Sequence, residues 1–138
     1  MEIEKETKET VQQVILLVDD EPMILEIFSE VLRDAGFDVD TASNGNEALL
    51  KATERKYDLI LLDIMMNDGP DGIEVLKTIK SDKEKYHNPI VVMLTNISIA
   101  NNIKDALYYG AEGYLVKVSL SNELLVKNVK GYLKGFRD

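Results

Sequence analysis

The sequence contains no cysteine, and this absence removes several kinds of chemistry at once. A chain without thiols forms no disulfide, binds no metal through thiolate and has no cysteine nucleophile. Nothing in the composition therefore points to an oxidising compartment. We expect the protein to be cytoplasmic.

A long apolar run is also missing from the beginning of the chain. Residues 1–10, MEIEKETKET, alternate charged residues with threonine, which is not the pattern of a signal peptide or of a membrane-spanning helix. We expect no membrane partner. We predict that residues 1–12 are a flexible lead-in and that residues 13–138 form one globular domain, because the remaining length and composition suit a single core.

Positive charge is scarce. The 16 lysines and arginines face 25 aspartates and glutamates, which gives a formal net charge of -9. A protein that binds nucleic acid normally needs a basic stripe to neutralise phosphates. We therefore expect no direct contact with nucleic acid.

The sequence has no glycine-rich phosphate-binding turn where a nucleotide-binding protein would need one. The first apolar run, at 14–18, leads into Asp19-Asp20-Glu21-Pro22 instead of a GxGxxG or Walker loop. A phosphatase or phosphotransferase with an aspartate nucleophile after its first strand would carry a second aspartate two residues later, whereas here the two acids are adjacent. Both classes are therefore disfavoured.

Short apolar runs alternate with helical stripes five times along the chain. The runs predict strands at 14–18, 37–42, 59–62, 89–94 and 113–116, and the stripes predict helices at 23–35, 46–55, 72–80, 99–107 and 121–133. This alternation indicates an α/β fold with a parallel sheet covered on both faces. Right-handed crossovers favour a doubly wound sheet with strand order 2-1-3-4-5.

Polar residues gather where the predicted strands end. They are Asp19, Asp20, Asp63, Thr95 and Lys117. In a parallel sheet the carboxyl ends of the strands form the ligand crevice, so these side chains should meet at one edge. Three carboxylates, a hydroxyl and an ammonium suit a hard cation such as Mg²⁺ together with a phosphoryl group.

Each of these residues has a predicted role. Asp63 can act as a nucleophile that forms an acyl phosphate, while Asp19 and Asp20 hold the Mg²⁺. Thr95 can donate its hydroxyl to one phosphoryl oxygen and Lys117 can pair with another. A single acid after a strand is more often ordinary turn chemistry, so the prediction depends on the joint placement of all five.

Four motifs give a family resemblance. They are VDDEP at 18–22, LLDIMM around Asp63, VVMLTN at 91–96 and GYLVK at 113–117. With these motifs the chain resembles the receiver domains of two-component response regulators, in particular single-domain receivers similar to the chemotaxis response regulator. The resemblance implies a flavodoxin-like (βα)5 fold, Mg²⁺, and transfer of a phosphoryl group to Asp63 from a histidine kinase, a histidine phosphotransfer protein or a small phosphodonor.

The same resemblance implies a switch. Thr95 would turn towards the phosphoryl group while Tyr114 rotates inward, and partners would recognise the surface of the fourth helix, fifth strand and fifth helix. Because the chain ends just after that helix, we expect the effect to pass through a downstream protein, a phosphorelay or an output domain of a longer protein. We class the chain as a signalling phosphoacceptor with its own Mg²⁺-dependent phosphorylation and dephosphorylation, and not as an enzyme.

Three features depart from the family pattern. The loop at 64–72 has an apparent extra residue, and in it the backbone carbonyl of Met65 is the expected additional metal ligand. Asn96 follows Thr95 where a smaller residue is usual. Val118 replaces a proline after Lys117, so we expect a trans peptide there. The altered loop and Asn96 leave open a second possibility, a degenerate receiver that binds proteins without accepting phosphate.

Overall fold

The computed structural model describes residues 11–96 and 100–135. In chain order its elements are β1 (Val14–Val18), α2 (Pro22–Asp34), β2 (Asp38–Ala42), α3 (Gly45–Glu54), β3 (Leu59–Asp63), α4 (Gly72–Ser81), β4 (Ile90–Thr95), α5 (Ala100–Tyr108), β5 (Gly113–Val116), the 3₁₀ turn η1 (Lys117–Ser119) and α6 (Asn122–Gly135). Among the described helices, none combines the length and apolarity needed to cross a bilayer.

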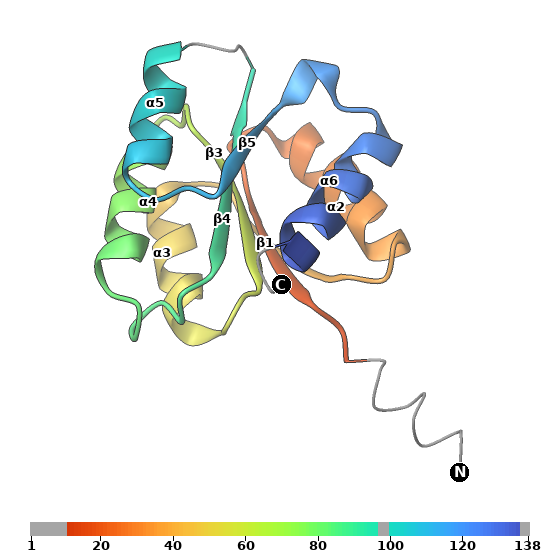
Figure 1. Cartoon of the computed structure of the whole chain (residues 1–138), viewed down its shortest axis with the longest axis horizontal. Coiled ribbons are helices and arrows are strands. Elements are labelled where there is room, and N and C mark those ends of the chain that lie inside the picture. Colours follow the sequence, from red (N-terminus) through yellow and green to blue (C-terminus); the bar gives the residue numbers. More distant parts are fainter. Residues whose placement is uncertain (1–10, 97–99, 136–138) are drawn as a thin grey trace.

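The five strands form one parallel sheet in the order β2-β1-β3-β4-β5, as the sequence predicts. Figure 1 shows α2 and α6 on one face of this sheet and α3, α4 and α5 on the other. The central strands are continuous apolar runs because helices cover both of their faces. Along β1, Ile15 and Leu17 pack in the cluster that includes α2 and α6, while Leu16 and Val18 pack in the cluster on the opposite face.

The predicted ends of the elements shift by a residue or two, and two apolar residues lie outside the core. Helix α6 continues through Gly131 to Gly135, beyond its predicted end at residue 133. Ile27 and Leu107 belong to predicted apolar stripes but are 43% and 47% exposed. Each helix turns only part of its circumference towards the sheet, so the edge of a wide stripe stays in solvent. The predicted start of the fourth helix, at residue 99, falls outside the described residues.

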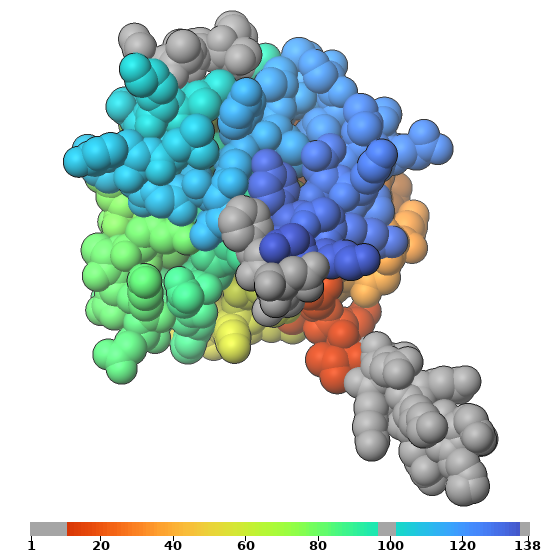
Figure 2. Space-filling model, viewed as in Figure 1, coloured from red at the N-terminus to blue at the C-terminus, as the bar shows by residue number. Residues whose placement is uncertain are grey.

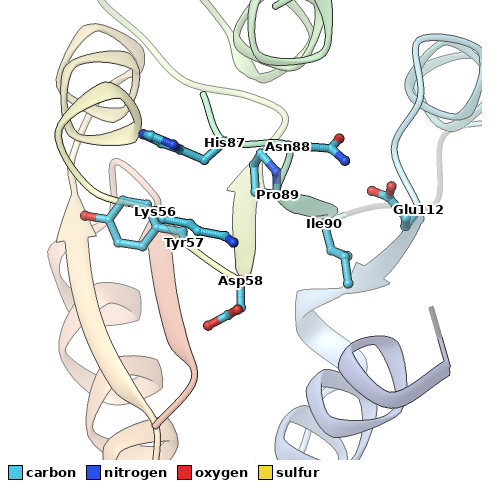
Figure 3. Close-up of a pocket in the computed structure, with 8 residues that line it drawn as sticks. All are labelled: Lys56, Tyr57, Asp58, His87, Asn88, Pro89, Ile90 and Glu112. Atoms are coloured by element: carbon cyan, nitrogen blue, oxygen red, sulfur yellow. The ribbon is translucent and has the colours of Figure 1, made fainter. Parts of the chain in front are cut away.

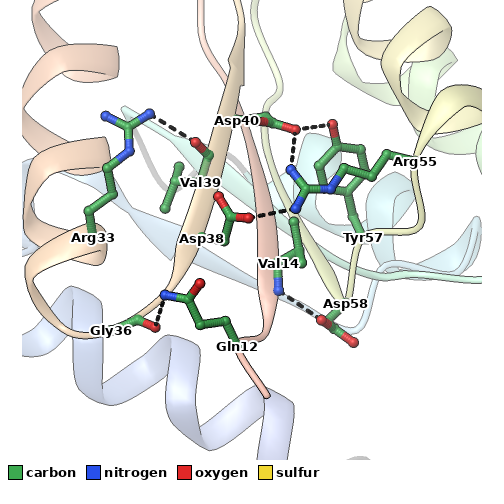
Figure 4. A network of polar contacts seen from close by, with 10 residues as sticks. All are labelled: Gln12, Val14, Arg33, Gly36, Asp38, Val39, Asp40, Arg55, Tyr57 and Asp58. Carbon is green, nitrogen blue, oxygen red and sulfur yellow. Dashed lines mark hydrogen bonds and ion pairs between the residues drawn. The ribbon is translucent and has the colours of Figure 1, made fainter. Parts of the chain in front are cut away.

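The edge strand β2 is held in place by polar contacts. Arg55 reaches Asp38 at 2.5 Å and Asp40 at 2.9 Å, and the Tyr57 hydroxyl donates to Asp40 at 2.6 Å (Figure 4). Arg33 donates to the carbonyl of Val39 at 2.8 Å. These contacts fix β2 against its neighbours, although the partly exposed ion pairs add little stability.

Glycine is required where the loop after β3 returns past the end of that strand. A Cβ at Gly72 would lie 2.1 Å from the carbonyl oxygen of Asp63, far inside van der Waals contact. Helix α4 then begins with a capping box, in which Asp71 accepts from the Glu74 amide and Glu74 accepts from the Asp71 amide. The backbone at Asp63 is therefore packed directly against the first turn of α4.

We predict that Gly72→Ala lowers the free energy of unfolding by about 1–3 kcal/mol, because the added methyl group forces the Asp63 backbone to move. Gly131→Ala is the matched control: a Cβ there meets no atom within 4 Å. The control should stabilise the protein by about 0.5–1 kcal/mol, since alanine favours a helix interior. Urea denaturation checks both values, and equal effects of the two changes would contradict the close packing at Gly72.

Candidate functional site

The strand order and register bring the predicted site residues to one edge of the sheet. Val18 lies opposite Leu62, so the residues that follow them, Asp19 and Asp63, are neighbours. Lys117 follows β5 directly, at the same edge. Four of the five polar side chains that the sequence singled out are buried, which is unusual for polar groups: Asp19, Asp63, Thr95 and Lys117.

Three carboxylates form the acidic part of the site. Asp19, Asp20 and Asp63 each offer an oxygen, and these oxygens lie within 4.8 Å of one another. Asp19 and Asp63 are buried and Asp20 is half-buried. Within residues 11–96 and 100–135, this is the one group of three or more such side chains close enough to hold a metal ion together. Oxygen ligands in this number suit a hard divalent cation.

The ammonium group of Lys117 lies between the carboxylates. Its Nζ is 2.6 Å from Asp19 Oδ2, 3.4 Å from Asp63 Oδ2 and 3.4 Å from Glu21 Oε1. The Lys117 side chain is only 3% exposed, so water screens these charges weakly. The peptide bond to Val118 is trans, as expected from the missing proline.

Burial controls the proton affinities of this cluster. Removal from water and, to a lesser extent, the neighbouring charge of Asp19 raise the pKa of Asp63 to about 7, although Lys117 offsets part of both effects. Burial likewise raises the pKa of Asp19. Burial alone would lower the pKa of Lys117, but Asp19 and Asp63 more than compensate and raise it. Burial of the two acids therefore outweighs the stabilisation that the Lys117 ammonium gives to their ionised forms.

The loop after β3 adds backbone donors to the site. The amide of Met65 donates to Asp63 Oδ1 and the amide of Asn67 donates to Asp20 Oδ2, each at 3.3 Å. The Met65 side chain is 68% exposed at the mouth of the crevice. The role of the Met65 carbonyl as a metal ligand stays a prediction.

Thr95 and Tyr114 occupy different environments. Thr95 ends β4 and is 6% exposed, beside the acidic cluster. Tyr114 lies in β5 and is 38% exposed, so it is not a core aromatic. The inward rotation of Tyr114 that the family resemblance implies would start from this partly exposed position.

Two site residues were not assigned by sequence reasoning. Glu21 belongs to the VDDEP motif and contacts Lys117, and its position beside the acid pair was the available signal. Asn67 acts through its backbone amide, which no side-chain pattern encodes. Both line a crevice of about 590 Å³ together with Asp63 and Asn96.

A second hollow lies at the opposite, amino-terminal edge of the sheet (Figure 3). Its two carboxylates already bond to strand amides: Asp58 accepts from Val14 at 2.8 Å and Glu112 accepts from Val91 at 2.7 Å. Glu112 also pairs with Lys80 at 3.0 Å. These acids have structural roles at the strand starts. His87, the one histidine in the sequence, lines this hollow and lies away from the acidic cluster.

The comparison with protein families identifies the chain. The model of the response regulator receiver domain matches residues 15–130. The chain therefore belongs to the receiver domain family of response regulators.

Curated relatives agree with this assignment. The chain is 37% identical over 126 residues to the transcriptional regulatory protein ResD of Bacillus subtilis, covering 91% of this chain and 50% of ResD. It is 34% identical over 119 residues to the DNA-binding response regulator MtrA of Mycobacterium tuberculosis, covering 86% of this chain and 50% of MtrA. The chain thus spans about half the length of these relatives.

Solved structures show the same architecture. A CheY-like receiver domain protein from Methanospirillum hungatei superimposes with a TM-score of 0.83 at 26% identity, covering 92% of this chain and 98% of that chain. The chemotaxis protein CheY4 of Vibrio cholerae gives a TM-score of 0.80 at 32% identity, covering 87% and 98%. The flavodoxin-like fold expected from the sequence is confirmed.

The pKa of Asp63 predicts how stability depends on pH without metal. Because the folded-state pKa of about 7 exceeds the reference value of 3.8, the folded state binds more protons between these values, and the free energy of unfolding falls as pH rises through that window. Above about pH 7, a pKa raised by this much lowers the free energy of unfolding by on the order of 4 kcal/mol. Asp63→Asn should remove most of this fall.

Urea denaturation in a chelator, from about pH 4 to about pH 8, measures this effect in wild type and Asp63→Asn. Mg²⁺ should stabilise the wild type more at the upper end of this range, where Asp63 is ionised. Parallel pH profiles for the two proteins would contradict the electrostatic account of the site.

Proposed function

We propose that Asp63 accepts a phosphoryl group from the phosphohistidine of a histidine kinase or a histidine phosphotransfer protein. The observation that carries this proposal is the position of Lys117, whose ammonium lies within 3.4 Å of both Asp19 and Asp63 in a buried site. A cation at this point can pair with an oxygen of a phosphoryl group attached to Asp63.

The residues present fit Mg²⁺. Asp19, Asp20 and Asp63 supply carboxylate oxygens close enough for one ion, and the backbone carbonyl of Met65 would complete the set. The raised pKa of Asp63 supports this assignment, because burial and the charge of Asp19 both disfavour the ionised carboxylate, which a bound divalent cation would favour. When bound, Mg²⁺ would neutralise the carboxylates and the charge on the transferring oxygens.

The protein's own groups would carry the transfer. A carboxylate oxygen of Asp63 attacks phosphorus, the bond from phosphorus to the donor nitrogen breaks, and the electron pair of that bond remains with the imidazole. Lys117 pairs with one phosphoryl oxygen and the Thr95 hydroxyl donates to another. Attack of water on phosphorus later returns Asp63 and releases inorganic phosphate. We propose that the chain is a phosphoacceptor with a transient covalent mark, and not an enzyme acting on other molecules.

The output surface is proposed to be α5, β5 and α6. Figure 2 shows α5 and α6 on the viewed face, with the segment that contains β5 between them. Two tyrosines lie at the end of α5. Tyr108 is 82% exposed, while the ring of Tyr109 is partly covered by Lys77, whose Nζ lies 4.3 Å from the ring centroid. Inward rotation of Tyr114 towards the space left by Thr95 would change this surface, and a downstream protein or an output domain would recognise the change.

The setting of this switch is proposed from the composition of the chain. We propose that residues 13–138 are the receiver, that residues 1–12 are a lead-in, and that the protein works in the cytoplasm without binding membranes. The net charge of -9 supports a receiver that does not itself contact nucleic acid. Residues 1–10 of the lead-in lie outside the described part of the chain.

Intact-mass spectrometry after incubation with acetyl phosphate or fluoroberyllate tests the proposal. We predict a Mg²⁺-dependent adduct on the wild type and none on Asp63→Asn, because the substitution removes the nucleophilic oxygen. An adduct that persists in Asp63→Asn would place the acceptor elsewhere. No adduct under any condition would favour the degenerate receiver.

A second prediction concerns the metal. Asp20→Ala should weaken Mg²⁺ binding by at least about tenfold. Removing a group that only supports a metal ligand already costs about this much, and Asp20 is proposed as a ligand itself. Isothermal titration calorimetry measures the affinity. Asp34→Ala, an exposed acid at the far end of α2, is the matched control and should bind Mg²⁺ as the wild type does. Equal affinities for the two variants would exclude Asp20 as a ligand.

A further inference from the structure

Glu21 stands at the mouth of the crevice and has no role in the proposed reaction. It is the N-cap residue of α2, yet its side chain makes no capping hydrogen bond. Serine, threonine, aspartate and asparagine are the residues that cap helices well. The Glu21 carboxylate instead reaches Lys117, with Oε1 at 3.4 Å from Nζ.

This contact competes with the acceptor for the same ammonium. Lys117 Nζ is as far from Glu21 Oε1 as from Asp63 Oδ2, 3.4 Å in each case. The Glu21 side chain is 54% exposed, while that of Lys117 is 3% exposed. Of the three carboxylates that contact the buried ammonium, Glu21 is therefore the exposed one. It also lines the crevice that leads to Asp63.

We propose that Glu21 slows phosphorylation of Asp63 by small dianionic phosphodonors such as acetyl phosphate. The inference rests on the proposed function of Asp63. A dianion entering the crevice approaches the negative charge of Glu21 and must also draw Lys117 away from it. Both effects oppose the step in which an Asp63 oxygen attacks phosphorus and acetate leaves with the electron pair of the broken bond.

The test compares labelling rates with acetyl phosphate and Mg²⁺ by intact-mass spectrometry. Glu21→Gln should be labelled about threefold to tenfold faster than wild type at low salt, because the repulsive charge is gone while the shape is kept. Glu21→Asp should stay near the wild-type rate, since it retains the charge. Glu26→Gln makes the same charge change at an exposed position of α2 outside the crevice and should not accelerate labelling.

Salt dependence separates a local field from a structural role. The advantage of Glu21→Gln should shrink as ionic strength rises to about 1 M, where the Debye length falls to about 3 Å. Glu21 could instead serve only to stabilise the amino terminus of α2. That role predicts a lower free energy of unfolding for Glu21→Gln with an unchanged labelling rate.

Each outcome decides between the claims. Equal rates for wild type and Glu21→Gln, or equal acceleration by Glu26→Gln, would overturn the role of Glu21 and leave the phosphoacceptor assignment intact. If Glu21→Gln were labelled faster than wild type by the same factor at all salt concentrations, the role of Glu21 would be overturned as well. No labelling of any variant would instead remove the proposed function of Asp63, and the inference about Glu21 with it.

Discussion

The site depends on one buried ammonium group placed among carboxylates. Lys117 compensates Asp19 at 2.6 Å and reaches Asp63 at 3.4 Å, in a place where water can screen neither acid well. Without this cation, two buried carboxylates at adjacent strand ends would be strongly destabilising. Burial and the charge of Asp19 together raise the pKa of Asp63. One ammonium does not neutralise three carboxylates, so the site suits a divalent cation.

The fold supplies this arrangement through the order of its strands. The central position of β1 and β3 places Asp19 beside Asp63, and β4 and β5 extend the same edge with Thr95 and Lys117. Helices cover both faces of the sheet, so its central strands are buried. The close approach of Gly72 to the Asp63 carbonyl holds the Asp63 backbone against the start of α4. The site is therefore a property of the whole sheet and not of one loop.

Strand order and the main site residues were predictable from the sequence because they follow from position. A polar residue directly after a buried strand must lie at the crevice, so Asp19, Asp63 and Lys117 could be placed without coordinates. Contacts made by backbone or by flexible side chains could not. The Asn67 amide that bonds to Asp20 carries no residue signal, and the reach of Glu21 to Lys117 depends on the angle at which α2 leaves β1. The exposure of Ile27 was likewise missed, because a hydrophobic stripe does not show how much of the helix circumference the sheet covers.

The central claim is that the carboxylate of Asp63 becomes an acyl phosphate. Borohydride reduction of the labelled protein, followed by peptide mapping, tests it most directly, because reduction of an acyl phosphate converts aspartate to homoserine at the modified position alone. The account predicts homoserine at residue 63, dependent on Mg²⁺ during labelling. Homoserine at another aspartate, or an adduct that borohydride does not reduce, would contradict it.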